Sequence, residues 1–197
     1  MQDNHLGVDY GSKMAGTTAV AMVQNGELYL WQCAKDKDAD LWLQGLVQEL
    51  KPAVVYIDAP LTLPMVYSQD VQTPESDFFY RQADREVQAM SPMFIGGLTA
   101  RAMKLRTQLA AKGTAMLETY PTQAVKLLLP HLQGYKKEPA ALQAYAEALQ
   151  GQLKYPLRHP AENWHQIDAI LCWLSGFRHN NNKAILYGRA TEGRIIV

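Results

Sequence analysis

Four acidic residues stand where a folded chain could gather them, and carboxylates are the side chains that hold hard metal ions. Asp9 ends the short apolar segment 5–10, and Asp58 ends the apolar run 53–57. Glu118 lies near the end of the segment 114–119, and Asp168 lies within the helix-like segment 161–177. Because sites in open α/β sheets gather at strand ends, we predict that these four acids carry the chemistry.

Grouped carboxylates restrict which chemistry is plausible. They repel one another at neutral pH unless a positive charge lies between them. Hard oxygen ligands without His or Cys beside them favour Mg²⁺ or Mn²⁺. Two such ions about 3.5–4 Å apart could activate a water molecule and stabilise the leaving oxygen of a phosphodiester. The acids therefore favour metal-dependent hydrolysis of a phosphodiester.

Asp168 is the most informative of the four. On a helix, its neighbours one and two turns away are Trp164, Leu171, Cys172 and Ser175, a largely apolar face. A carboxylate on that face is buried, and an unpaired buried charge is very costly. We therefore expect Asp168 to meet a cation, a group of donors or a metal.

Each of the other acids also has an ordinary structural interpretation. Asp9 precedes Gly11 and could begin a turn, and Asp58 precedes Ala59-Pro60 and could cap the loop that follows. Glu118 could pair with a nearby basic residue. These alternatives remain open from the sequence alone.

Basic residues supply candidate substrate contacts. Asp84 lies between Arg81 and Arg85 at helical spacing, so it could orient one arginine while the other meets a phosphate. A surface ion-pair helix explains the same pattern. The further candidate phosphate contacts are Arg101, Lys104, Lys136 and Lys137.

Aromatic residues and histidines give weaker indications of a binding site than the acidic and basic residues. Tyr120 and Trp164 could stack on a base, although core packing explains them as well. His159 and His165 are six residues apart and do not share a helical face, so we assign no metal to them.

The net charge of the 197 residues is zero, with 19 basic and 19 acidic side chains, which argues against a strongly basic nucleic-acid binder. The charge is nevertheless uneven along the chain. Residues 1–98 hold 6 basic and 13 acidic residues, whereas residues 99–158 hold 9 basic and 3 acidic residues. The segment 99–158 could therefore face phosphate, so neutrality excludes only tight and indiscriminate binding.

Periodicity predicts the elements that must position these residues. Residues 1–34 predict three antiparallel strands, with Asn25-Gly26 as the turn of the second hairpin. The run 53–57 predicts a buried strand and the segment 114–119 another. Helices are expected over 40–50, 77–90, 99–112, 122–129, 139–150 and 161–177, and residues 183–197 are expected to return as an edge strand.

This order predicts an α/β fold with a mixed sheet flanked by helices on both faces. We find no repeat, linker or low-complexity segment. The chain is therefore expected to form one domain over 1–197, with helical insertions around 59–98 and around 130–160.

Cellular location is inferred from simple features. The two cysteines, Cys33 and Cys172, suit free thiols in a reducing compartment. The longest charge-free stretch, 87–100, is shorter than the roughly 20 apolar residues of a membrane span. The first residues lack the pattern of a secretion signal. We expect a cytoplasmic protein without a membrane partner.

The motifs together resemble a known family. Gly7-Val-Asp9-Tyr-Gly11-Ser resembles the first-strand motif of the ribonuclease H-like superfamily. The other matching motifs are Ile57-Asp58-Ala-Pro60-Leu61, Arg81-Gln-Ala-Asp84-Arg85, Glu118-Thr-Tyr120-Pro121, Ile167-Asp168-Ala169 and Glu192-Gly193-Arg-Ile195. They resemble a bacterial and archaeal "domain of unknown function" family described as predicted nucleases with a ribonuclease H fold.

The resemblance implies a ribonuclease H-like, five-stranded mixed sheet in the order 3-2-1-4-5. It implies that Asp9, Asp58 and Asp168 bind Mg²⁺ or Mn²⁺, as in RuvC-type Holliday-junction resolvases, with Glu118 as a fourth acid. It also implies nucleic acid as the substrate. Members of the superfamily often carry Glu where this chain has Asp58, whose side chain is shorter.

Two other functions fit the same sequence. The loop Asp9–Lys13 resembles the phosphate loop of the sugar-kinase and actin-like superfamily, which would make the protein a nucleotide or phosphate-ester binder. That superfamily normally needs two such domains, which a homodimer of this chain could supply. A non-catalytic scaffold is the other alternative, because a fold does not fix a function.

Overall fold

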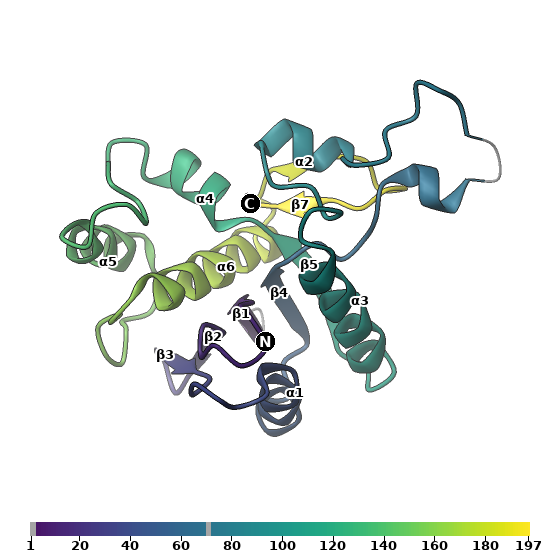
Figure 1. Ribbon diagram of the computed structural model, residues 1–197. Coiled ribbons are helices and arrows are strands. Elements are labelled where there is room, and N and C mark those ends of the chain that lie inside the picture. Colours follow the sequence, from purple (N-terminus) through teal and green to yellow (C-terminus); the bar gives the residue numbers. More distant parts are fainter. Residues whose placement is uncertain (1–2, 70–71) are drawn as a thin grey trace.

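A central mixed sheet organises the chain, which we describe from a computed structural model covering residues 3–69 and 72–197. The strand order across the sheet is β3-β2-β1-β4-β5-β7-β6 (Figure 1). The strands are β1 (His5–Asp9), β2 (Ala19–Gln24), β3 (Glu27–Gln32), β4 (Val54–Asp58), β5 (Ala115–Thr119), β6 (Leu186–Tyr187) and β7 (Ile195–Ile196).

The first five strands confirm the expected order 3-2-1-4-5 in a mixed α/β sheet. β2 lies antiparallel to β1 and β3, whereas β4 lies parallel to β1 and β5. The prediction of five strands was too low, because the described residues form seven. β7 pairs with β5, and β6 forms the edge strand of the sheet beside β7. Both lie within 183–197, the segment expected to return as one edge strand; the sequence did not show that it divides into two strands of two residues, which are too short to display alternation.

Local residues explain the hairpin and the first helix. Asn25 and Gly26 both have positive φ, as the tight turn between β2 and β3 requires. The helix α1 (Ala39–Leu50) begins after Asp38, whose carboxylate accepts hydrogen bonds from the amides of Asp40 and Leu41. The sequence therefore sets these boundaries.

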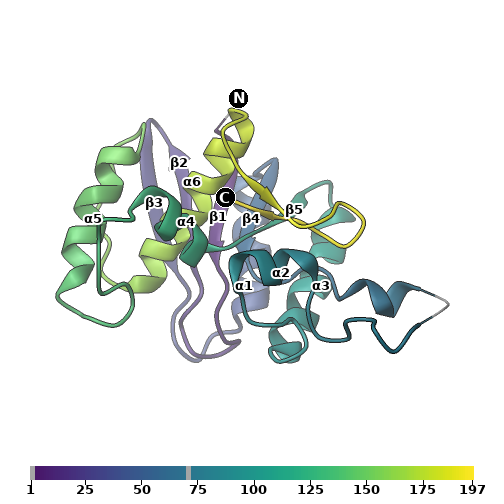
Figure 2. The same ribbon diagram turned by 90° about the horizontal axis from the view of Figure 1, so that it is seen from above.

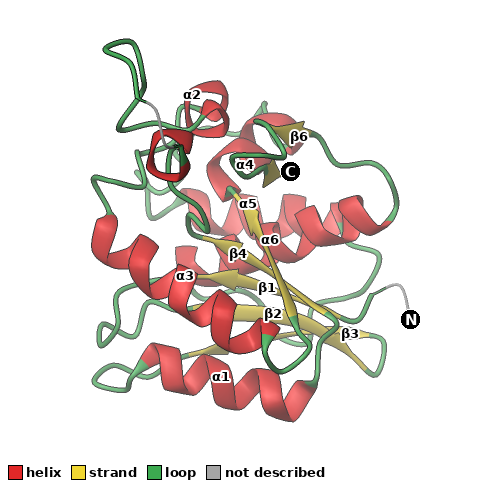
Figure 3. Ribbon diagram, turned by 90° about the vertical axis from the view of Figure 1, so that its right-hand side faces the viewer, coloured by secondary structure: helices red, strands yellow, loops and turns green. Residues whose placement is uncertain are grey.

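Helices cover both faces of the sheet, as predicted. α1 and α3 (Gly96–Ala110) pack on one face, and α6 (Trp164–Asn180) crosses the other face against β1, β2 and β4 (Figure 3). α4 (Pro121–Leu128) and α5 (Ala141–Gln152) pack around α6. Within the described residues, no helix has the length and apolar character needed to cross a membrane.

The segment between β4 and α3 is less helical than expected. It contains the single 3₁₀ turn η1 (Met65–Ser68) and the short α2 (Gln82–Val87) in place of a helix over 77–90. Residues 70 and 71 of this segment lie outside the described residues. Figure 2 shows that the segment extends from the sheet on the side away from α5.

One close contact fixes the height of α6 above the sheet. A Cβ atom placed on Gly7 would lie 2.1 Å from the backbone nitrogen of Trp173 and 2.4 Å from the carbonyl oxygen of Ala169. Only glycine lets the helix backbone lie directly on the middle of β1. This contact brings the first half of α6 to the carboxyl end of β1, where the candidate acids gather.

Candidate metal centre

Sheet register brings two of the acids together. Asp9 and Asp58 are the last residues of β1 and β4, and they are direct partners across this parallel pair. Val8 and Ile57 belong to the apolar cluster under α1 and α3. Because side chains alternate along a strand, Asp9 and Asp58 turn to the other face, toward α6.

Asp168 of α6 completes the group from above. One carboxylate oxygen from each of Asp9, Asp58 and Asp168 lies within 4.8 Å of the other two. Asp168 is completely buried, and Asp9 is 8 % exposed. We call these three residues the acidic triad. The triad thus joins β1, β4 and α6 at one point.

Burial and mutual repulsion disturb the charge of the triad. Burial raises the pKa of Asp58 well above its usual value, and Asp9 and Asp168 raise it further. Burial also raises the pKa of Asp168 to about 6, with the ion pair to Lys136 opposing the rise. Each further negative charge at this point is therefore costly unless a cation is present.

A lysine from the chain already lies against the triad. The ammonium group of Lys136 forms an ion pair with Asp168, and the hydroxyl of Tyr135 donates a hydrogen bond to the other carboxylate oxygen. Lys136 has a φ of 59°, an uncommon conformation for a lysine, in the loop that follows α4. Although burial alone would lower it, the pKa of Lys136 is raised by Asp168, Asp58 and Asp9.

His165 contacts the triad from the start of α6. Its Nδ1 lies 2.7 Å from Oδ2 of Asp9, and this hydrogen bond raises the pKa of the imidazole. The six-residue spacing from His159, which puts the two histidines on different helical faces, does not reveal this contact. The spacing of three residues between His165 and Asp168, which puts both on one helical face, is the signal that could have identified it.

The structure keeps Glu118 out of the triad. Glu118 is the register partner of Ile57, so its side chain turns away from α6. Its two carboxylate oxygens accept hydrogen bonds from Arg81 at 2.6 and 2.7 Å, and one also accepts from the amide of Leu61. Burial raises the pKa of Glu118, and Arg81 opposes the rise.

Arg81 and Asp84, expected at the substrate, lie inside the protein. Arg81 has no exposed surface, and Asp84 is 1 % exposed. All five guanidinium N–H groups are used, because Arg81 donates to Asp84, Glu118 and Thr62. No N–H group is left for a phosphate, so this buried network joins α2 to β5.

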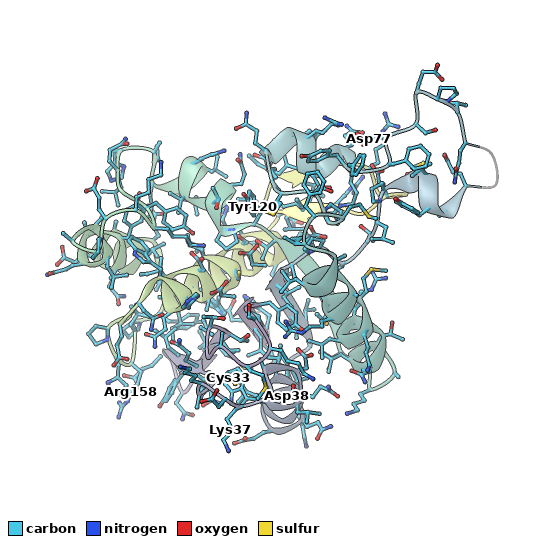
Figure 4. All side chains as sticks on the ribbon, in the orientation of Figure 1. Cys33, Lys37, Asp38, Asp77, Tyr120 and Arg158 are labelled. Atoms are coloured by element: carbon cyan, nitrogen blue, oxygen red, sulfur yellow. The ribbon has the colours of Figure 1, made fainter. Side chains whose placement is uncertain are left out.

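None of the other cations predicted to contact substrate, apart from Lys136, pairs with a triad residue among the described contacts. Arg85 lies 4.6 Å over the ring of Tyr80 and pairs with Asp77, which is labelled toward the upper right of Figure 4. Arg101 binds Asp40 through Nε and Nη2. The side chains of Lys104 and Lys137 are exposed.

The two residues predicted as candidates for base stacking, Trp164 and Tyr120, lie in different environments. Trp164 packs edge-on against Tyr135 and Tyr145, with ring centroids 5.4 and 5.3 Å away, which is a core arrangement. Tyr120 is half-buried where β5 meets α4 (Figure 4). It lines a cavity of about 240 Å³ that Asp58 also lines.

The donor set of the triad fits a hard divalent ion. Three carboxylates converge from three elements, and among the described residues no cysteine sulfur or histidine nitrogen belongs to the group, His165 being a hydrogen-bond partner of Asp9. The ion pair between Lys136 and Asp168 shows that the group already attracts a cation. A divalent ion would compete with the Lys136 ammonium for Asp168.

Known proteins resemble this chain in structure and not in sequence. No protein-family model and no curated protein sequence matches this chain. Among solved structures, Thermus thermophilus RuvC is 13 % identical, with a TM-score of 0.46 over 98 % of this chain and 99 % of that chain. T. thermophilus RuvC in complex with a Holliday junction substrate is 13 % identical, with a TM-score of 0.48 over 97 % and 98 %.

A third similar structure is the yeast mitochondrial Holliday junction resolvase Ydc2. It is 14 % identical, with a TM-score of 0.46 over 92 % of this chain and 82 % of that chain. Likeness at this level does not fix the role of any residue. The chemistry of the site has to follow from its own geometry.

Proposed function

We propose that this protein is a metal-dependent phosphodiesterase that cleaves nucleic acid. Asp9, Asp58 and Asp168 would hold Mg²⁺ or Mn²⁺. The observation that carries the proposal is the convergence of three carboxylates from β1, β4 and α6 to within 4.8 Å. Such a group is unfavourable for folding alone, so a cation-dependent role is the simplest reason for it.

Divalent ions at these carboxylates would lower the pKa of a bound water and neutralise charge on the phosphoryl oxygens. The chain itself orients the ligands. His165 fixes one oxygen of Asp9, and Tyr135 fixes one oxygen of Asp168. Positioning of this kind from neighbouring residues is typical of working metal sites.

Lys136 compensates the triad when no metal is bound. Its ammonium pairs with Asp168 on a flexible four-carbon stem. If a divalent ion were bound at the triad, Lys136 would no longer be needed for this compensation and could contact an anionic group of the substrate. We therefore assign Lys136 to charge balance in the metal-free protein and to substrate phosphate in the loaded one.

The loop after β1 favours cleavage over nucleotide binding of the actin-like kind. Phosphate loops use free backbone amides. Here the amide of Gly11 donates to the hydroxyl of Thr18, and the amide of Ser12 donates to the hydroxyl of Thr17, each at 3.1 Å. Lys13 pairs with Asp38 at 3.0 Å. These three donors already have partners within the protein, two in the loop itself and one at the start of α1.

The experiment combines metal binding with cleavage. Calorimetry with Mg²⁺ and Mn²⁺ is expected to show binding to the wild-type protein and none to Asp58→Asn. Labelled single-stranded, duplex and four-way-junction DNA and RNA are expected to be cut only with metal present. Folded wild-type protein that binds neither ion would overturn the proposal.

A further inference from the structure

Both carboxylate oxygens of Asp168 already have a partner from the chain. Oδ2 pairs with the ammonium group of Lys136, and Oδ1 accepts a hydrogen bond from the hydroxyl of Tyr135. Asp168 has no exposed surface, and its Oδ2 atom is shielded from solvent. A metal ion could therefore reach this carboxylate only after Lys136 had moved away from it.

The two strand acids of the triad have more ligand atoms to offer. Oδ2 of Asp9 is hydrogen-bonded to His165, but Oδ1 of Asp9 has no hydrogen bond or ion pair among the described residues. Neither oxygen of Asp58 has such a partner in that part of the chain, and the residue is half-buried. The available oxygens of the triad therefore belong to Asp9 and Asp58.

A cavity of about 240 Å³ adjoins Asp58. Its charged lining residues are Asp58, Asp84 and Glu118, and no described Lys, Arg or His side chain lines it. Arg81 compensates Asp84 and Glu118 through its hydrogen bonds to both, so Asp58 is the acid that is left without a cation. Because Mg²⁺ usually keeps several water ligands and binds through one or two carboxylates, this space suits an ion at the strand acids.

Lys136 can withdraw from Asp168 without disturbing the fold. Its side chain is 42 % exposed, although its ammonium group contacts a carboxylate that has no exposed surface. The lysine belongs to the loop after α4, and its flexible four-carbon side chain can adopt other rotamers. Its other side-chain contact among the described residues is with Tyr135, whose ring centroid lies 5.3 Å from the ammonium nitrogen. The ion pair is therefore a contact that a competing cation can displace.

Formal charge limits how many cations the triad can hold together with Lys136. The three carboxylates carry three negative charges when all are ionised. With His165 neutral, one divalent ion and the Lys136 ammonium would supply three positive charges and balance them. A second divalent ion beside a retained lysine would leave two excess positive charges at a largely buried point, which is costly. Withdrawal of the lysine would remove one of them, and a phosphodiester group would balance the other.

We propose that Lys136 limits the triad to one divalent ion, held by Asp9 and Asp58, until the lysine leaves Asp168. Lys136 thereby makes the two ion positions unequal, because only the position at Asp168 requires its withdrawal. The inference rests on the proposed function and adds regulation to it, since two-ion hydrolysis of a phosphodiester needs both positions. A substrate phosphate that draws Lys136 away would favour the second ion, and the second ion would favour the phosphate equally.

The test counts bound ions without measuring cleavage. Calorimetry and the electron paramagnetic resonance signal of free Mn²⁺ give the stoichiometry and affinity of Mn²⁺ for the wild-type protein and for three variants. Lys136→Met removes the ammonium group, and Lys136→Arg keeps a positive charge at the same position. Lys137→Met is the matched control, because it removes one exposed positive charge from the same loop.

We expect the wild-type protein, Lys136→Arg and Lys137→Met to bind one ion, with a second ion bound roughly tenfold or more weakly. Lys136→Met should bind two ions in the range of Mn²⁺ concentration where the wild type binds one. Thermal unfolding checks the fold of each variant. Two ions of equal affinity in the wild type would overturn the inference even if Lys136→Met did not fold. A single ion in folded Lys136→Met, bound as in the wild type, would also overturn it.

Different results separate this inference from the proposed function. Metal-dependent cleavage by a wild-type protein that binds two ions equally would overturn the role of Lys136 and leave the nuclease standing. One ion in the wild type and two in Lys136→Met, without cleavage under any metal, would support the role of Lys136 and overturn the nuclease. Folded proteins that bind no Mn²⁺ in any of the four titrations would overturn both.

Discussion

Asp9 and Asp58 are direct register partners at the carboxyl ends of two adjacent parallel strands. This relationship holds two carboxylates side by side, and Asp168 adds a third from α6. Backbone hydrogen bonds between the strands hold the two residues next to each other. Their repulsion is a cost that the fold carries unless a cation compensates it.

The variant Asp58→Asn should therefore stabilise the metal-free protein. Asparagine keeps the shape and removes the charge of a half-buried carboxyl group, whose pKa is raised by desolvation and by Asp9. Each kcal/mol of relieved repulsion should raise the Tm by about 2–4 °C for a domain of this size. Calorimetry should show that metal binding is lost.

The control for this variant is Asp36→Asn, an exposed position with positive φ where asparagine is equally suited. It should change neither the Tm nor metal binding. A lower Tm for Asp58→Asn, with metal binding intact, would assign Asp58 a purely structural role.

The pH should control both stability and metal affinity through Asp168. Its pKa is raised from 3.8 to about 6, so between these values the folded chain holds a proton that the unfolded chain has released. The resulting stability is complete below pH 3.8 and is lost as the pH rises through about 6. The raised pKa of His165 acts in the same direction.

Protons and metal ions compete for the same oxygens, so metal should stabilise the protein more at about pH 7.5 than at about pH 5. Thermal melts with and without Mg²⁺ at these two values measure the difference. An equal metal-induced shift at both would show that the ion binds away from Asp168.

Lys136→Met should make folding depend more strongly on metal. The variant removes the ammonium group that pairs with Asp168 and keeps the length of the side chain. We expect a loss of about 1–2 kcal/mol without metal, less than for a fully buried pair because Lys136 is partly exposed. Divalent ion should restore more stability to this variant than it adds to the wild type.

Lys137→Met is the matched control, one residue along the same loop with an exposed side chain. Urea unfolding of both variants, with and without Mg²⁺, makes the comparison. Equal metal-free stability of the two variants would mean that the Lys136 ion pair does not compensate the triad.

Arg81→Met should destabilise the protein without touching the triad. It leaves the buried carboxylates of Asp84 and Glu118 uncompensated, which costs about 3–5 kcal/mol for a buried pair. Arg85→Met removes a surface pair with Asp77 and should cost less than about 1 kcal/mol. Chemical denaturation gives both values.

Binding measurements on the same variants separate structure from recognition. If Arg81→Met were as stable as Arg85→Met and bound nucleic acid more weakly, Arg81 would be a phosphate contact after all. The geometry predicts the opposite, because every guanidinium N–H group already has a partner.

Local sequence was sufficient to predict the framework. The apolar run before Asp58 predicts a buried strand, and the Asn25-Gly26 turn predicts the hairpin. These features depend on neighbouring residues, which interact at short range in any chain conformation. The order of the first five strands followed from the same pattern together with the family resemblance.

Predicting that Glu118 lies apart from the three aspartates would have required knowledge of the register between β4 and β5. A shift of one residue reverses the face of every side chain, so Glu118 and Thr119 would exchange places. Nothing in the segment 114–119 indicates which residue pairs with Ile57. Packing of both sheet faces decides that pairing.

What the sequence by itself determined is the order of the first five strands' segments, the main helices and the acids that they carry. Only the tertiary structure decided which side chains meet those acids. Lys136 and Tyr135 reach Asp168 from about 30 residues away, and His165 reaches Asp9 across 156 residues. The physical reason is that charge compensation acts through space, where α6 lies on β1 at Gly7, and not along the chain.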